Sequence, residues 1–530
     1  MIKKIDPFYL IIILISGLLY LPFLGSVHLF DWDEINFAEC AREMIRSGNY
    51  LQLQIDFHPF FEKPPLFIWM QVLSMKSFGV NEFAARLPDA LCGITTLCTL
   101  YFLGKREFNS QLAKRWVLAY AGSLLPQFYF KSGIIDPWFN LCIFLSLYQY
   151  FIFYKNKMKH IAGWRALFLS GLFLGLAVLT KGPIAAILFF ILWLISLAIF
   201  RHSKKIFSRE WFVFAVTLCA ISGSWFFVIW NNTGSEFIHQ FLNYQWRLLT
   251  TGEAGHGQPW WYHLPVILFG CFPASAFLFL KSKNISESDS QKIWKQMMWV
   301  LFFIVLILFS IVKTKIVHYT SLCYFPLSFL AAYFLSHSEN YLSQVKLMKV
   351  VALMTGLILS VALLLIPFIA SHPQSISSMI KNEYVLGCLN AGVEWKWFTF
   401  LPAIVLLSGI SIAFIFFHSL KKMFLTLFVS SILCVQLIQI LIIPLVEKQT
   451  QGAAIEFYEQ VKKNNETVDA YRFKSYAYLF YTDKPQANKT SEWEKYLVMR
   501  ADLNYETEIW AQYGRIGVKN GFIFLQKKEK

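Results

Sequence analysis

The chain has 530 residues, of which 56% are hydrophobic, 18% aromatic and only 15% charged. Apolar runs of about 20 residues recur along most of its length, a pattern typical of a chain that crosses a membrane many times. This composition excludes a soluble globular protein. The net charge of +16 is explained by basic residues in loops beside the membrane, so it gives no reason to expect a nucleic-acid partner.

Taken in chain order, the apolar runs predict about thirteen membrane-spanning helices. They lie near residues 8–25, 85–104, 113–131, 135–154, 163–180, 183–200, 211–230, 260–280, 294–312, 316–336, 346–370, 397–418 and 421–446. The loops after every second span, near residues 105–115, 155–165, 201–209 and 281–295, are rich in lysine and arginine. Because such loops tend to stay in the cytoplasm, we expect the N-terminus there and, with an odd number of spans, the C-terminus outside.

Three sizeable loops are then expected on the outer side, at residues 26–84, 231–259 and 371–396. The first contains "DWDEINFAECAREMIRSGNY", in which Phe37, Cys40, Ala41 and Met44 follow a helical spacing. This spacing predicts a short amphipathic helix along the membrane interface. Its first turn holds Asp33 and Glu34, where the helix dipole favours carboxylates, so capping explains these acids as well as catalysis does.

The same loop continues with "FFEKPPLFIW", which holds Glu62 and Lys63 between aromatic residues and a proline pair. The prolines restrict the backbone and so limit the directions in which these two side chains can point. Charges near a bilayer are costly, about 2.5–3.5 kcal/mol at its centre, and tend to be retained for function. The loop is therefore the first candidate for a functional site.

From residue 447 onward the composition turns polar, and helical and strand-like patterns alternate in "GAAIEFYEQVKKNN", "YLVMRADL" and "GFIFLQKK". We expect two domains: a transmembrane domain over residues 1–446 and a small soluble α/β domain over residues 447–530 on the outer face. The second domain contains no chemical motif.

Several motifs, in order, resemble a known family. "DWDEINFAECAREMIRSGNYL", "PFFEKPPLFIWM" and "FGVNEFAARLPDAL" are similar to the first outer loop of the GT-C integral-membrane glycosyltransferases, in the branch of protein O-mannosyltransferases and lipid A aminoarabinose transferases. "SGIIDPWFN", "GLAVLTKGP", "GHGQPWWYHLP" and "VKTKIVHYTSLCYFP" resemble later motifs of that branch, so the similarity covers roughly residues 1–340. The resemblance implies an all-α GT-C fold in the cytoplasmic (inner) membrane. It also implies transfer of a sugar from a polyprenyl phosphate to lipid A, an envelope glycan or a protein.

A glycosyl phosphate already has a good leaving group, so such a site needs cations for the phosphate and one carboxylate to take a proton. The resemblance assigns the general base to Asp33, beside Glu34, with inversion of the anomeric centre. Asp136, in "IIDP", matches a second acid of the family. An aspartate before proline is, however, also an ordinary helix start.

For the donor phosphate, the resemblance points first to Lys63, and Lys181 in "TKGP" lies where the fifth span should emerge on the outer side. Further candidates from the outer loops are Arg247, Lys313, Lys315, His318 and Tyr319. Lysines at span ends also occur simply because their side chains reach toward water. Function is favoured here because three groups of cations lie on the side where topology disfavours them.

Two further assignments concern the sugar and a metal. Trp260 and Trp261 suit either a sugar face or a membrane interface. Because some branches of the family are associated with a metal, His256 and Glu62 are candidate ligands of a divalent ion, although their spacing does not indicate one and a lone histidine is usually structural. No other cofactor is expected.

A transporter or flippase of a lipid-linked or anionic substrate is the alternative, and a non-catalytic scaffold is the third possibility. A transporter would place ionisable residues near the membrane midplane, in paired repeats. Here the acids lie at span ends and no repeat is visible, which favours an enzyme. The sequence does not identify the sugar, the acceptor or the oligomeric state.

Overall fold

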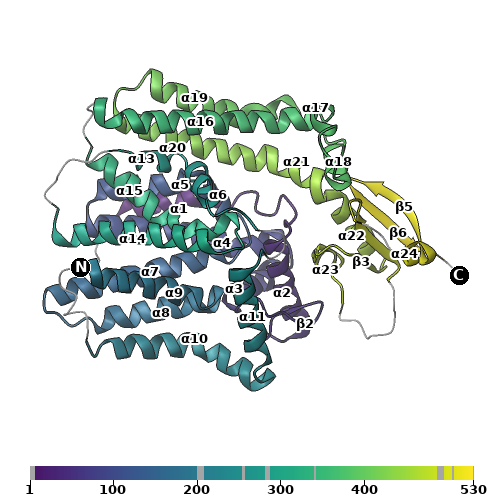
Figure 1. The fold of residues 1–530 in the computed structure, drawn as a ribbon, viewed down its shortest axis with the longest axis horizontal. Helices are drawn as coiled ribbons and strands as arrows, with labels where there is room; N and C mark the ends of the chain where they lie inside the picture. Colours follow the sequence, from purple (N-terminus) through teal and green to yellow (C-terminus); the bar gives the residue numbers. More distant parts are fainter. Residues whose placement is uncertain are drawn as a thin grey trace.

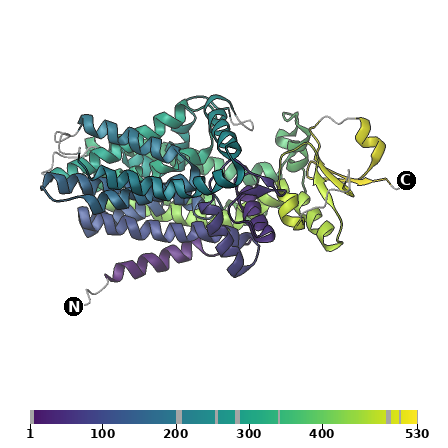
Figure 2. The same cartoon turned by 90° about the horizontal axis from the view of Figure 1, so that it is seen from below.

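The computed structural model of the chain describes residues 6–199, 208–252, 257–280, 287–338, 342–485, 494–503 and 507–528. Most of these residues are helical, and a small sheet lies at the C-terminal end (Figure 1). The predicted fold class, a helical membrane protein with a small C-terminal α/β part, is confirmed. The two termini lie at opposite ends of the molecule (Figure 1 and Figure 2). We call the end of the helical bundle next to the sheet the site end.

The first half of the bundle contains α1 (Pro7–Tyr20), α4 (Glu82–Glu107), α5 (Ser110–Ala121), α6 (Leu124–Tyr129), α7 (Asp136–Met158), α8 (Trp164–Lys181), α9 (Ile184–Ile199) and α10 (Trp211–Thr233). The second half contains α12 (His263–Gly270), α13 (Ala274–Phe277), α14 (Asp289–Ile311), η3 (Val317–Cys323), α15 (Tyr324–Ser336), α16 (Leu342–Ser371), η4 (Trp397–Phe400), α19 (Leu401–Ile415) and α20 (Leu420–Leu437). Each of the predicted spans coincides with one or two of these helices. Within the described residues, 7 helices are long and apolar enough to cross a membrane, and α1 and α9 are among the shorter apolar helices.

Two predicted spans are broken helices rather than continuous ones. The span predicted at 113–131 is divided into α5 and α6, and the span at 260–280 is divided into α12 and α13. The second break coincides with Pro273, which cannot donate a backbone hydrogen bond. Polar groups at the first break form hydrogen bonds with backbone carbonyls at the second. The Leu124 amide donates to the Phe272 carbonyl at 3.2 Å, and the Ser123 hydroxyl donates to the Cys271 carbonyl at 3.4 Å.

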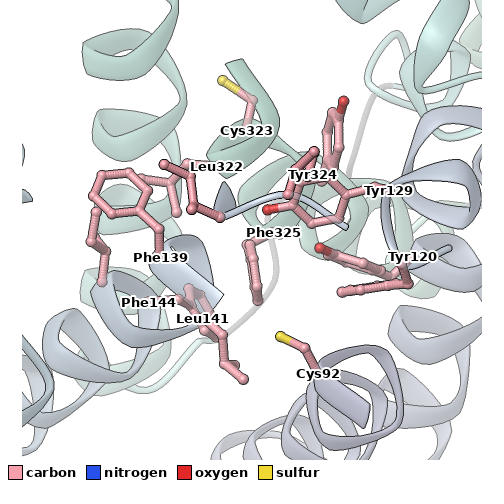
Figure 3. Packing of buried hydrophobic residues seen from close by; sticks show 14 of the residues in the cluster. Cys92, Tyr120, Tyr129, Phe139, Leu141, Phe144, Leu322, Cys323, Tyr324 and Phe325 are labelled. Atoms are coloured by element: carbon pink, nitrogen blue, oxygen red, sulfur yellow. The ribbon is translucent and has the colours of Figure 1, made fainter. Parts of the chain in front are cut away.

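Aromatic side chains fill the centre of the bundle, where α5, α6, α7 and α15 meet (Figure 3). The rings of Phe144 and Phe325 stack with their centroids 4.4 Å apart, and such pairs add about 0.5–1.5 kcal/mol to packing. The Asn140 amide donates to the hydroxyls of Tyr129, at 2.6 Å, and of Ser321, at 2.7 Å. These contacts tie α7 to α6 and η3, so the core fixes the ends of the elements that carry the site.

The predicted loop at 26–84 is folded into α2 (Asp33–Ser47), the hairpin of β1 (Gln54–Ile55) and β2 (His58–Pro59), and α3 (Leu66–Phe78). The helix α2 begins where the sequence predicts, but it is buried on all sides from Glu34 to Met44. Its polar face pairs with protein instead of facing water. The Glu43 carboxylate accepts the amides of Asp56 and Phe57, and Arg42 pairs with Glu39 at 2.6 Å and with Asp483 at 2.9 Å.

The other two predicted loops are also partly helical. The loop at 231–259 contains α11 (Glu236–Thr250), and the loop at 371–396 contains α17 (Gln374–Ser377) and α18 (Glu383–Leu389).

The last apolar helix does not stop at the predicted domain boundary. It runs without interruption for 44 residues, Leu420–Lys463, through α20, η5 (Ile438–Ile442), α21 (Ile443–Glu447), η6 (Lys448–Gly452) and α22 (Ala453–Lys463). The segments η5 and η6 are π-helical turns. A division of the chain at residue 446 would therefore cut a continuous helix.

After this helix the chain forms a four-stranded sheet with the order β3-β4-β6-β5. Its elements are β3 (Val468–Ala470), α23 (Ala477–Thr482), β4 (Tyr496–Arg500), α24 (Thr507–Gln512), β5 (Tyr513–Lys519) and β6 (Phe522–Lys527). The β3–β4 pair is parallel and the other pairs are antiparallel. The helix α23 packs against α2, which brings this C-terminal part to the site end of the bundle.

Candidate functional site

Six of the residues predicted from the sequence meet at one small pocket at the site end. The pocket has a volume of about 40 Å³. It is lined by Trp32, Asp33, Lys63, Ile135, Asp136, Lys181, Tyr244, Leu248, Thr314, Ile316, His318 and Tyr319. Its charged groups come from α2, the 26–84 loop, α7, α8 and η3, so the fold gathers side chains that are up to 285 residues apart in sequence (Asp33 to His318).

Asp33 is the first residue of α2, and its carboxylate lies in this pocket. His318 Nε2 lies 3.3 Å from Asp33 Oδ2 and 3.6 Å from Asp136 Oδ2, so one imidazole lies between two carboxylates. The side chain of Asp33 retains 25% of its exposure, whereas that of Asp136 retains 3%. Asp33 is therefore the acid that an incoming ligand can reach.

Asp136 and Lys181 form a buried ion pair at the site ends of two adjacent helices. Asp136 begins α7, Lys181 ends α8, and the distance from Lys181 Nζ to Asp136 Oδ1 is 2.5 Å. The second oxygen, Asp136 Oδ2, has no hydrogen-bond partner within the described residues. The ammonium of Lys181 also lies over the ring of Tyr319, 4.8 Å from its centroid. This pair presents a cation and a free carboxylate oxygen to the same pocket.

Lys63 is buried next to Asp33, with its ammonium 5.0 Å from the centroid of the Tyr244 ring. Burial lowers the pKa of Lys63 below that of a free lysine, and the nearby carboxylates of Glu62 and Asp33 oppose this effect. A buried ammonium without a close carboxylate contact gains from binding an anion. Lys63 thus offers a positive charge to an anion at the pocket.

The pKa of Asp33 reflects the balance of the whole pocket. Burial raises the pKa of this carboxyl, but the hydrogen bond from His318 and the charges of His318, Lys63 and Lys181 together lower it below its usual range. Asp33 is therefore ionised at neutral pH, as a proton acceptor must be.

Glu34 lines the large cavity together with Asp33, but both of its carboxylate oxygens are already hydrogen-bonded. Arg86 donates to its two oxygens at 2.9 and 2.8 Å, and the amides of Gly133 and Phe30 donate to it at 2.7 and 2.9 Å. Arg86 also donates to the carbonyls of Leu24, Val27 and His28. This geometry gives Glu34 a structural role, in contrast to the catalytic role expected from the sequence.

Five other predicted residues lie beside the pocket or away from it. Lys313 is exposed, Lys315 is buried and donates to the Val312 carbonyl at 2.6 Å, and Arg247 is exposed on α11 with its guanidinium over the Tyr244 ring. None of them lines the pocket. Trp260 and Trp261 are 69% and 51% exposed and do not line the pocket, although the nearby Gly257 forms a β-bridge with Thr314, which does.

Of the two predicted metal ligands, only Glu62 lies within the described residues. Glu62 accepts a hydrogen bond from the Tyr244 hydroxyl, and its Oε1 lies 3.9 Å from Lys474 Nζ. His256 lies outside the described residues. The described part of the chain contains no group of three or more His, Cys, Asp or Glu that could hold a metal ion.

Comparisons with known proteins show what this chain is similar to. A family model described as Dolichyl-phosphate-mannose-protein mannosyltransferase matches residues 62–230, the segment that holds Lys63, Asp136 and Lys181. A relative from Shewanella sediminis, named undecaprenyl phosphate-alpha-4-amino-4-deoxy-L-arabinose arabinosyl transferase, is 28% identical over 370 residues. That alignment covers 67% of this chain and 65% of the relative, just under two thirds of its length. A protein of the same name from Wigglesworthia glossinidia brevipalpis is 28% identical over 395 residues, covering 72% of this chain and 68% of that protein.

Among solved structures, ArnT from Cupriavidus metallidurans bound to undecaprenyl phosphate matches with a TM-score of 0.74 and 15% sequence identity. The match covers 98% of this chain and 97% of that chain. The chain has the GT-C fold. The resemblance to the GT-C glycosyltransferases that its motifs indicate is confirmed, and the chain is a multi-pass membrane protein.

A second, larger cavity of this GT-C chain adjoins Asp33 on the side away from Lys63. It has a volume of about 470 Å³ and shares Trp32, Asp33, Ile316 and His318 with the small pocket. Its other walls come from the segment between α1 and α2, from Arg86 on α4, from the end of α6 and the residues after it, and from the last long helix, and they combine apolar with charged side chains. Asp33 therefore stands between two cavities of different character.

Three residues that line the two cavities were not predicted from the sequence. Tyr244 lines the small pocket, while Lys131 and Gln439 line the large cavity. Lys131 immediately precedes the recognised motif "SGIIDP", so its position was a usable signal. Tyr244 and Gln439 carry no such signal, because an aromatic residue or a glutamine in an apolar helix has no distinctive spacing.

Proposed function

We propose that this chain is a glycosyltransferase that moves a sugar from a polyprenyl-phosphate donor to an acceptor oxygen, with Asp33 as general base. One observation carries the proposal: an ionised carboxylate, Asp33, lies between a cation-lined pocket and a larger cavity. The relatives named as arabinosyl transferases of undecaprenyl phosphate support this class of donor.

The small pocket suits the phosphate of the donor. Lys63, Lys181 and His318 surround it, and cations placed where charge develops stabilise a departing phosphate. The free Oδ2 of Asp136 can accept a hydrogen bond from a sugar hydroxyl. The sugar of the donor and its phosphate leaving group thus contact the two partners of one ion pair, Asp136 and Lys181.

An apolar groove suits the isoprenoid chain of the donor. It has a volume of about 450 Å³ and is lined by side chains of α9 and α14: Ile191, Ile195, Trp299, Val300, Phe303, Ile304, Ile307, Leu308 and Ile311. The helix α9 begins three residues after Lys181, and α14 ends three residues before Thr314, which lines the small pocket. Both walls of the groove therefore continue into the cation-lined pocket, as a lipid with a phosphate head requires.

The reaction follows from these positions. An acceptor oxygen in the large cavity attacks the anomeric carbon, and the bond between that carbon and the phosphate oxygen breaks. The acceptor group is a hydroxyl or a phosphate monoanion, and its proton passes to Asp33. The polyprenyl phosphate leaves with the bonding electrons, and Lys63 and Lys181 stabilise its negative charge. Because acceptor and phosphate lie on opposite sides of the carbon, the configuration inverts.

The membrane side follows from charge and position. The basic loops at 105–115 and 155–165 lie at the end opposite the site, and basic loops tend to stay in the cytoplasm. We therefore assign the site and the C-terminal sheet to the outer face of the cytoplasmic membrane. Lipid A, an envelope glycan or a protein remains the acceptor class.

Donor binding is expected to raise the basicity of Asp33, since a bound phosphate neutralises the cations that lower its pKa.

Asp33→Asn tests the proposal in purified protein supplied with an undecaprenyl-phosphate-linked aminoarabinose donor and a lipid A acceptor. Since a general base contributes roughly 10²- to 10⁴-fold, we expect kcat to fall at least about 100-fold while donor affinity changes by less than about threefold. Asp56→Asn, in the exposed hairpin of the same loop, is the matched control and should retain activity. Full turnover by Asp33→Asn would refute the assigned base.

A further inference from the structure

The segment His28–Trp32, which leads into Asp33, contains no helix or strand apart from a turn at its end. Buried backbone groups must still find hydrogen-bond partners, so the position of this segment depends on the side chains that supply them. Leu29 is fully buried. The groups that satisfy its backbone therefore determine where Asp33 lies.

Those groups come from the C-terminal part of the chain. The Leu29 amide donates to the Tyr481 hydroxyl at 2.8 Å, and the Leu29 carbonyl accepts from Gln451 Nε2 at 2.8 Å. The Asp31 amide donates to Gln451 Oε1 at 3.4 Å. One glutamine side chain thus bonds a carbonyl at Leu29 and an amide at Asp31, the pairing that a neighbouring β-strand would supply.

The location of Gln451 supports a special role. It lies in the π-helical turn η6, and such turns within α-helices are frequent at functional sites. Glu447, four residues earlier on the same helix, contacts the same segment, because its Oε1 lies 2.9 Å from His28 Nδ1. The last helix of the bundle therefore forms hydrogen bonds with the segment before Asp33 through two side chains, Glu447 and Gln451.

Independent contacts hold α2 itself. Arg42 pairs with Asp483 at 2.9 Å, and Arg46 pairs with the same carboxylate, which lies just after α23. The C-terminal part thus fixes Asp33 from both sides, through the segment that precedes it and through the helix that it begins.

We propose that Gln451, assisted by Tyr481, is a positioning residue that holds Asp33 within reach of His318 and the acceptor. The proposal rests on the function assigned above and gives the C-terminal part a catalytic purpose. Gln451 does not touch the reacting atoms. It acts through the backbone of Leu29 and Asp31, and a misplacement of about 1 Å can reduce a rate about 100-fold.

Gln451→Leu tests this role, with Gln449→Leu as the matched control. Gln449 lies in the same π-helical turn but bonds Trp395 and the Leu389 carbonyl instead of the segment before Asp33. Both variants remove one amide from the same helix. We expect Gln451→Leu to lower kcat about 10- to 100-fold with donor KM within threefold, and Gln449→Leu to lower it less than threefold.

The pH profile separates positioning from general destabilisation. His318, Lys63 and Lys181 hold the pKa of Asp33 low, so a displaced Asp33 should lose part of that effect, and the acidic limb of kcat should move to higher pH in Gln451→Leu alone. An unchanged limb and an unchanged kcat, or equal losses in both variants, would overturn the proposal.

Amide hydrogen exchange makes the result independent of the proposed reaction. Exchange at the Asp31 amide, which donates to Gln451, should accelerate at least tenfold in Gln451→Leu and remain unchanged in Gln449→Leu. Unaltered exchange in Gln451→Leu refutes the positioning role, whereas wild-type protein that shows normal protection but no sugar transfer refutes the proposed function instead.

Discussion

Replacing His318 by glutamine should shift the pH dependence of sugar transfer. His318 Nε2 lies 3.3 Å from Asp33 Oδ2, and its hydrogen bond is the first of the contributions that lower the pKa of Asp33 against the effect of burial. Glutamine preserves a neutral donor of similar reach but cannot carry the positive charge of an imidazolium. The substitution thus removes charge while keeping polarity.

The expected size of the shift follows from the geometry. A hydrogen bond to a charged group contributes about 1.5–3 kcal/mol and a neutral one about 0.5–1.5 kcal/mol, so loss of the charge alone removes up to about 2 kcal/mol, which corresponds to a range of about one to one and a half pKa units. Lys63 and Lys181 remain, and the Asp33 side chain retains 25% of its exposure, so we take the lower limit of about one unit. Because only the carboxylate can accept a proton, a higher pKa moves the acidic limb of activity to higher pH.

The measurement is kcat/KM for the donor between about pH 3.5 and 7.5, since this ratio reports the pKa values of the free enzyme. His337→Gln is the control, because His337 bonds the Tyr333 carbonyl at the far end of α15. Below about pH 4.5 we expect His318→Gln to lose a larger fraction of its activity than wild type, while the two converge above about pH 6. An acidic limb at the wild-type position would show that His318 does not set the charge state of Asp33.

Two further predictions concern the support of the site and the donor lipid. Arg86→Met leaves the Glu34 carboxylate and three backbone carbonyls buried without their arginine partner, so it should destabilise the fold by about 3–5 kcal/mol. Thermal unfolding in detergent measures this loss, with Arg106→Met as the control. An unchanged unfolding transition would contradict the structural role of the Arg86–Glu34 pair. Ile307→Trp obstructs the groove between α9 and α14, so it should raise KM severalfold for a long-chain polyprenyl donor but not for a short-chain one. Val361→Trp on α16 is its control, and equal effects on both donors would exclude the groove as the site of the lipid chain.

The helical elements were largely predictable because local properties determine them. Continuous apolar runs can only be membrane helices, and each predicted span coincides with helix in the structure. The start of α2 at Asp33 also follows from its amphipathic spacing and its acidic first turn. The broken spans were not predicted, since the contact between the Leu124 amide and the Phe272 carbonyl joins residues remote in sequence.

The sequence predicts which motifs lie near the site, but not which of their residues line the pocket. Asp33, Lys63, Asp136, Lys181, His318 and Tyr319 line one pocket, and each belongs to a motif that the sequence displays. Arg247, Lys313, Lys315, Trp260 and Trp261 belong to equally visible motifs but do not line that pocket. Short motifs report which segments lie at the site end, whereas the direction of a side chain depends on how its helix is rotated in the bundle.

By itself, the sequence determined that the chain is a polytopic membrane protein and which loops hold its chemistry, because hydrophobic length and charge bias act locally. The resemblance had already pointed to Asp33, but only the tertiary structure shows how its surroundings differ from those of Glu34. The two are adjacent acids in one helical turn, yet Arg86 consumes Glu34 while His318 and the cavities leave Asp33 accessible. The distinction lies in partners 52 and 285 residues away, and no local pattern encodes contacts at that separation.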